Sequence, residues 1–126
     1  MADLLTKKIL AVDDEKEVLG YLRSMLQRSN YEVITATSGK EAVVLATEHK
    51  PDLILLDIVL PDIDGGDIAS LLSKNPVTAK IPIIFLTGIL KKEEEVFRTK
   101  TGKHLIIAKP VTKEKLLETI GKALQR

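Results

Sequence analysis

Short apolar runs alternate along this chain with longer segments in which apolar residues recur at helical spacing. The clearest run is Leu53–Leu56, which follows Pro51-Asp52 and stops at Asp57. A continuous apolar run this short, bounded by turn formers, is typical of a strand buried on both faces of a sheet. The pattern therefore predicts a central strand with Asp57 at its carboxyl end.

Four further runs are also predicted to be strands. They are Ile9–Val12, a weaker and more polar run that begins at Val33-Ile34, Ile81–Leu86, and Leu105–Ala108. Between the runs, apolar residues recur at the spacing of one helix face. These stripes comprise Val18, Leu19, Leu22, Met25 and Leu26; Ala42, Val43, Leu45 and Ala46; Ile68, Ala69, Leu71 and Leu72; and Leu116, Leu117, Ile120 and Leu124.

Two of the predicted helices begin with a recognisable capping residue. Ser38 and Glu41 have the spacing of a capping box, and Thr112 can cap the last helix. A further helix is predicted near Leu90–Phe97, where the charged run Lys91–Glu95 is typical of a solvated face.

Five βα units therefore follow one another along 126 residues, a length that suits one domain. Such alternation predicts a parallel sheet with helices on both faces and right-handed crossovers. We expect a single α/β domain over residues 1–126, with a flavodoxin-like, doubly wound sheet of five strands in the order 2-1-3-4-5 and five helices.

Composition narrows the classes of function. Lysine and arginine number 19 against 18 acidic residues, so the formal charge is +1, which argues against direct nucleic acid binding. The absence of cysteine excludes disulfides, thiolate metal sites and cysteine nucleophiles, and is consistent with a cytoplasmic location. No segment approaches the roughly 18 apolar residues that a membrane span needs, so we expect no membrane insertion.

Four of the five apolar runs stop at a notable polar group. These groups are Asp13-Asp14, Asp57, Thr87 and Lys109. Parallel strands place their carboxyl ends on one edge of the sheet, and in the order 2-1-3-4-5 these four strands are adjacent. We therefore expect three carboxylates, a hydroxyl and an ammonium group to converge on one shallow cleft.

This convergence indicates phosphoryl chemistry. The three carboxylates carry a charge of −3, and one lysine leaves −2, which a divalent cation would neutralise. Carboxylate oxygens are hard ligands that suit Mg²⁺. Asp57 can then act as a nucleophile toward phosphorus, while Lys109 and the Thr87 hydroxyl hold the phosphoryl oxygens.

Each residue taken alone also has a simpler explanation. Asp13 or Asp14 can cap the first helix. Asp57 and Thr87 can be turn residues, and Lys109 can be an ordinary surface lysine. We prefer the functional interpretation because all of them are expected at one edge.

The chain resembles the receiver domains of two-component signalling, of the stand-alone chemotaxis-regulator type, over essentially all of its length. The resemblance is carried by Val12-Asp13-Asp14-Glu15, Leu55-Leu56-Asp57, Pro61-Asp62-Ile63-Asp64-Gly65, Leu86-Thr87-Gly88 and Ala108-Lys109-Pro110. No one of these motifs is specific, but together, in this order and at these spacings, they are.

The resemblance implies a role for each site residue. Asp57 would accept a phosphoryl group from the phosphohistidine of a histidine kinase. Asp14, Asp57 and the backbone carbonyl of Val59 would bind Mg²⁺ directly, and Asp13 would act mostly through water. Thr87 and Lys109 would contact the phosphoryl group, and the Lys109-Pro110 bond is expected to be cis.

Such a domain is a switch rather than an enzyme. It would signal through a downstream effector protein or through an output domain outside this chain, and a phosphorylation-linked homodimer is compatible with it. A small aspartate-nucleophile phosphatase is disfavoured, because dehalogenase-type phosphatases place the nucleophile after the first strand and a second aspartate two residues later, where this chain has Val59. The remaining alternative is a phosphorylation-independent interaction module.

The chain departs from the family pattern at three places, which bear on its conformational response, its autodephosphorylation rate and its partner surface. Ile106 occupies the position of an aromatic switch residue, so we expect a weaker conformational response at the face of the fourth helix, fifth strand and fifth helix. Val59 and Ile89 flank the expected path of the hydrolytic water and are both apolar, so we expect slow autodephosphorylation. The basic stretch Lys100–His104 is a candidate partner surface.

Overall fold

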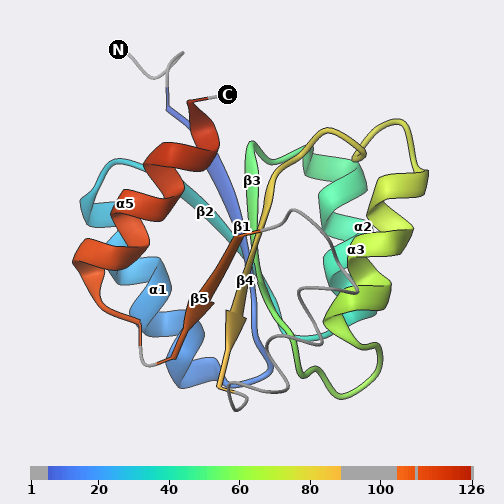
Figure 1. The fold of residues 1–126 in the computed structure, drawn as a ribbon, viewed down its shortest axis with the longest axis horizontal. Coiled ribbons are helices and arrows are strands. Elements are labelled where there is room, and N and C mark those ends of the chain that lie inside the picture. Colours follow the sequence, from blue (N-terminus) through green and yellow to red (C-terminus); the bar gives the residue numbers. More distant parts are fainter. Residues whose placement is uncertain (1–5, 89–104, 110, 126) are drawn as a thin grey trace.

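A computed structural model of the chain describes residues 6–88, 105–109 and 111–125. Within these residues, five parallel strands form one sheet in the order β2-β1-β3-β4-β5, as predicted (Figure 1). The strands are β1 (Lys8–Val12), β2 (Glu32–Ala36), β3 (Leu53–Asp57), β4 (Ile83–Thr87) and β5 (Leu105–Ala108). The helices are α1 (Lys16–Arg28), α2 (Gly39–His49), α3 (Gly65–Lys74) and α5 (Lys113–Leu124). The predicted helix near Leu90–Phe97 lies outside the described residues.

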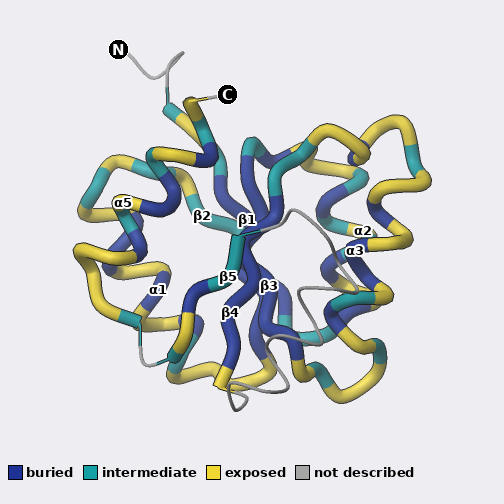
Figure 2. Tube along the Cα trace, in the orientation of Figure 1, coloured by how far each residue is buried: buried dark blue, intermediate teal, exposed yellow. Residues whose placement is uncertain are grey.

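The sheet separates two apolar cores. Helices α1 and α5 cover one face and α2 and α3 cover the other (Figure 1). Strand β3 contributes to both, because Leu53 and Leu55 join the cluster under α1 and α5 whereas Ile54 and Leu56 join the cluster under α2 and α3. All five of its residues are buried, so the prediction of a strand buried on both faces is confirmed (Figure 2).

Both predicted capping residues begin a helix. The Ser38 hydroxyl accepts a hydrogen bond from the Glu41 N–H at 3.2 Å, and the Thr112 hydroxyl accepts one from the Lys115 N–H at 3.2 Å. The Glu41 carboxylate accepts a hydrogen bond from the Thr37 N–H at 2.8 Å, one residue before the position that a capping box would use.

The inward orientation predicted for Leu71 is wrong, because its side chain is 48% exposed. The buried stripe of α3 is formed by Gly65, Ile68, Ala69 and Leu72. With about 100° between successive helical residues, Leu71 lies roughly a third of a turn from the centre of that stripe. Among the described helices, none has the length and hydropathy to cross a membrane.

The loop from β3 to α3 is closed tightly at its base. The Gly65 N–H donates to the Ile58 carbonyl at 2.9 Å. A Cβ atom at Gly65 would lie 2.9 Å from the Ile58 Cα and 3.0 Å from the Asp57 carbonyl oxygen, so the close approach of the two backbones leaves no room for a side chain. Asp64 then caps α3 by accepting a hydrogen bond from the Gly66 N–H at 2.6 Å.

Candidate functional site

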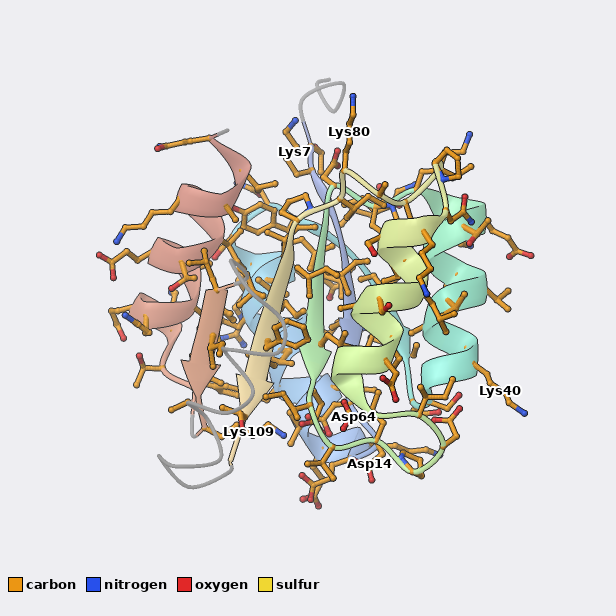
Figure 3. All side chains as sticks on the ribbon, turned by 45° about the vertical axis from the view of Figure 1, so that its right-hand side comes forward. Lys7, Asp14, Lys40, Asp64, Lys80 and Lys109 are labelled. Atoms are coloured by element: carbon orange, nitrogen blue, oxygen red, sulfur yellow. The ribbon has the colours of Figure 1, made fainter. Side chains whose placement is uncertain are left out.

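The register of the sheet brings four strand ends to the same level. Asp57 pairs with Leu86, so Thr87 lies one residue beyond it on β4. Val12 pairs with Leu56, which places Asp13 level with Asp57. Thr87 pairs with Ala108, and Lys109 follows directly. Figure 3 shows the labelled Asp14 and Lys109 at this carboxyl edge, away from Lys7 and Lys80 at the opposite end of the strands.

Three carboxylates meet at this edge. One oxygen each from Asp13, Asp14 and Asp57 lies within 4.8 Å of the others. Asp13 is completely buried and Asp57 is 6% exposed, whereas Asp14 is exposed. The cluster is therefore walled by protein on the Asp13 side and opens to solvent on the Asp14 side.

The Lys109 ammonium group lies between two of these carboxylates. Its Nζ is 2.9 Å from Asp13 Oδ2 and 3.5 Å from Asp57 Oδ1. The backbone N–H of Lys109 donates to the Thr87 carbonyl at 2.7 Å, which ties the end of β5 to the end of β4. Thr87 itself is buried at the end of β4.

Asp13 does not cap α1. Its Oδ1 accepts a hydrogen bond from the Glu15 N–H at 2.9 Å, and Glu15 is the N-cap residue, whose own side chain makes no capping hydrogen bond. One Asp13 oxygen therefore holds the turn that leads into α1, while the other holds Lys109.

Burial and neighbouring charges shift two pKa values at the site. Desolvation raises the pKa of Asp57, and the negative charge of Asp13 raises it further, against the opposing effects of Lys109 and the Val59 N–H. Burial acts to lower the pKa of Lys109, but the hydrogen bond to Asp13 and the charges of both carboxylates outweigh it and raise that pKa above its usual value. Lys109 is therefore a cation at neutral pH.

We expect the substitution Asp57→Asn to raise the free energy of unfolding at pH 7 in buffer without divalent cations. The folded-state pKa of Asp57 lies above its ordinary value of 3.8, so its ionisation disfavours the folded state. This penalty is absent where both states are protonated, below about 3.8, and develops as the pH rises through the folded-state pKa. Urea denaturation at several pH values checks this, with the exposed Asp67→Asn as control. An Asp57→Asn variant that is less stable than the wild type at pH 7 would contradict it.

The donor set of the cluster fits a hard divalent cation. Carboxylate oxygens from three residues lie close enough to share one ion, as Mg²⁺ requires. The Val59 N–H lies 3.4 Å from Asp57 Oδ1, so the Val59 main chain runs beside the cluster, whereas its side chain is 63% exposed. Asp13, Asp14 and Asp57 are thus available as candidate ligands, and the main chain of Val59, whose carbonyl is predicted to be a further ligand, passes next to Asp57.

Sequence reasoning missed a role for Asp62, which entered only as a member of the motif Pro61–Gly65. Its carboxylate accepts hydrogen bonds from the N–H groups of Gly39 and Lys40, at 2.8 and 3.0 Å. Nothing local signals this contact, since the partners lie 23 and 22 residues earlier in the chain.

Of the residues in the three departures, the structure describes Ile106 and Val59. Ile106 is half-buried against the cluster under α2 and α3, and Val59 is exposed beside the carboxylates. Ile89, the stretch Lys100–His104 and the Pro110 half of the Lys109-Pro110 bond lie outside the described residues.

Comparisons with known proteins give matches over most of the chain. A family model described as the response regulator receiver domain matches residues 9–121. The protein PilH of Pseudomonas aeruginosa is 35% identical over 93% of this chain and 97% of its own length. The polar-differentiation response regulator DivK of Brucella ovis is 35% identical over 92% of this chain and 94% of its own.

Solved structures of similar fold also match most of the chain. The chemotaxis protein CheY4 of Vibrio cholerae superposes with a TM-score of 0.87 at 29% identity, covering 94% of this chain and 99% of its own. A CheY-like receiver domain protein from Methanospirillum hungatei superposes with a TM-score of 0.86 at 32% identity, covering 95% of this chain and 94% of its own.

Proposed function

Because this chain belongs to the response regulator receiver domain family of two-component signalling, we propose that it is a phosphorylation-controlled switch whose phosphoacceptor is Asp57. The observation that carries the proposal is the placement of Lys109 between Asp13 and Asp57 at the carboxyl edge of the sheet. A lone acidic cluster would bind only cations, but a cluster with a held ammonium group can receive an anionic phosphoryl group as well.

In the proposed reaction, a carboxylate oxygen of Asp57 attacks the phosphorus of a phosphohistidine on a histidine kinase. The new O–P bond forms as the P–N bond breaks, the electron pair of that bond returns to the ring nitrogen, and the histidine, protonated on its other ring nitrogen, leaves as neutral imidazole. The Lys109 ammonium and the Thr87 hydroxyl then hold phosphoryl oxygens, and they supply positioning and charge stabilisation.

The proposed metal ion is Mg²⁺. Asp14, Asp57 and the Val59 carbonyl would hold it directly, and Asp13 would contribute mostly through water. When bound, Mg²⁺ supplies positive charge that offsets the carboxylates and the incoming phosphoryl oxygens. The clustering of three carboxylate oxygens within 4.8 Å supports this assignment.

Receiver domains are generally signalling switches rather than catalysts. We propose that residues 1–126 act as one such domain in the cytoplasm and report to an effector protein or to an output domain outside this chain, with no direct contact to nucleic acid. A homodimer that forms on phosphorylation is compatible with this. The second candidate is a phosphorylation-independent interaction module, which Ile106 favours because the usual aromatic switch residue is missing.

The test is the intact mass of the protein after incubation with Mg²⁺ and acetyl phosphate. We expect the wild type to gain one phosphoryl group, and both Asp57→Asn and a chelator-treated sample to gain none. If no adduct forms, binding of beryllofluoride, a phosphoryl mimic, is measured next. Failure of both would overturn the switch and leave the interaction module in its place.

A further inference from the structure

The β3–α3 loop, residues 58–64, carries Val59 past the carboxylate cluster and is fixed at its start, where buried Ile58 donates its N–H to the Leu86 carbonyl at 3.1 Å. The contact between Ile58 and Gly65 closes its base. Beyond Ile58 the loop is less deeply buried: Val59 is 63% exposed, and Leu60 and Ile63 are only partly buried against the core under α2 and α3. The position of the Val59 carbonyl therefore depends on how the middle of the loop is attached.

That attachment is the Asp62 carboxylate. Oδ1 accepts from the Gly39 N–H at 2.8 Å and Oδ2 from the Lys40 N–H at 3.0 Å, so both oxygens are engaged by the first turn of α2. Hydrogen bonds to an ionised group are stronger than neutral ones, and the amino end of a helix favours a negative charge. These two N–H groups hold the pKa of Asp62 below its ordinary value, as expected of a carboxylate stabilised in its charged form.

The first turn of α2 is also in close apolar contact with this loop. A Cβ atom at Gly39 would lie 2.8 Å from Ile68 Cδ1, 3.0 Å from Ile63 Cβ and 3.3 Å from Asp62 Oδ1. The loop and α2 therefore meet without space between them, and a shift of one requires a shift of the other.

We propose that Asp62 is a positioning residue that, by clamping the β3–α3 loop to the first turn of α2, holds the Val59 carbonyl in place for the metal ion. This inference rests on the proposed function. It also makes α2 responsive to the site, because coupling between two sites is reciprocal. An ion that holds the loop in place must strengthen the contacts of Asp62 with Gly39 and Lys40.

Three variants test the clamp. Asp62→Ala removes both hydrogen bonds, and Asp62→Asn keeps one acceptor oxygen but loses the charge and the second acceptor. The exposed Asp67→Asn, in the first turn of α3, is the control for a change of charge. Mg²⁺ affinity is measured by calorimetry, and urea denaturation of each variant separates loss of the clamp from loss of the fold.

We expect Asp62→Ala to weaken Mg²⁺ binding by about tenfold, the lower end of the range for residues that support metal ligands, with Asp62→Asn intermediate and Asp67→Asn unchanged. In the wild type, Mg²⁺ should slow hydrogen exchange at the amides of Gly39 and Lys40, and this slowing should disappear in Asp62→Ala. The clamp would be wrong, with the proposed metal site left standing, if all four proteins bound Mg²⁺ with equal affinity. It would also be wrong if Mg²⁺ did not change the hydrogen-exchange rates at these two amides in the wild type. A wild type that binds no Mg²⁺ would overturn the proposed metal site and the clamp together.

Discussion

Replacing Lys109 with methionine is expected to slow phosphorylation of Asp57 by acetyl phosphate by about 10²–10³-fold, the usual effect of removing one preorganised charge-stabilising group. The same substitution should strengthen Mg²⁺ binding, because the three carboxylates lose the cation between them. It should also lower the free energy of unfolding without Mg²⁺ by about 2 kcal/mol, since buried Asp13 loses a charged hydrogen bond of 2.9 Å. A time course of intact mass and a calorimetric titration measure the first two effects.

Slower phosphorylation together with stronger Mg²⁺ binding distinguishes loss of the catalytic lysine from loss of the fold. A variant that had simply unfolded would lose both phosphorylation and metal binding. The control is Lys113→Met, which removes an exposed lysine four residues later and should change neither. If Lys109→Met were phosphorylated at the normal rate, or bound Mg²⁺ more weakly than the wild type, the role proposed for this lysine would be wrong.

The second large effect concerns the lifetime of the phosphorylated state. Val59 is 63% exposed beside Asp57 and has no side-chain group that can orient a water molecule. We expect the half-life of the phosphorylated wild-type protein to be longer than seconds. The substitution Val59→Asn should accelerate its hydrolysis by about tenfold, less than the 10²–10⁴-fold that a positioned acid or base supplies. Loss of the adduct is followed by intact mass after the phosphodonor is removed.

The matched control for Val59 is Val77→Asn, another exposed valine, located beyond the carboxyl end of α3. Its hydrolysis rate should equal that of the wild type. A wild-type half-life of seconds, or a Val59→Asn variant as slow as the wild type, would show that this position does not control the lifetime.

The fold and most of the site geometry could be predicted from the sequence because their signals are local. Each of Asp13, Asp57 and Lys109 directly follows an apolar run, and a parallel sheet brings such strand ends to one edge. The capping roles of Ser38 and Thr112 were likewise predictable, because a cap and its target are three residues apart.

Other features could not be predicted because they depend on packing. The apolar residues around Leu71 occur as two adjacent pairs, and spacing alone does not decide which edge of that stripe meets the sheet. The contact of Asp62 with the start of α2 joins a loop to a helix that only the assembled sheet brings together. From the sequence, Asp62 has only the chemistry of a turn residue.

The sequence separation of 96 positions between Asp13 and Lys109 has a consequence for how the protein folds. Strands β1 and β5 are not neighbours, and their ends meet only after β3 and β4 have been inserted between them. Contacts that close so long a loop form late, because much chain entropy is lost before they are made. A nascent or partly folded chain thus contains Asp57 without Lys109 beside it, so under the proposed function only the fully assembled molecule would be phosphorylated at the full rate.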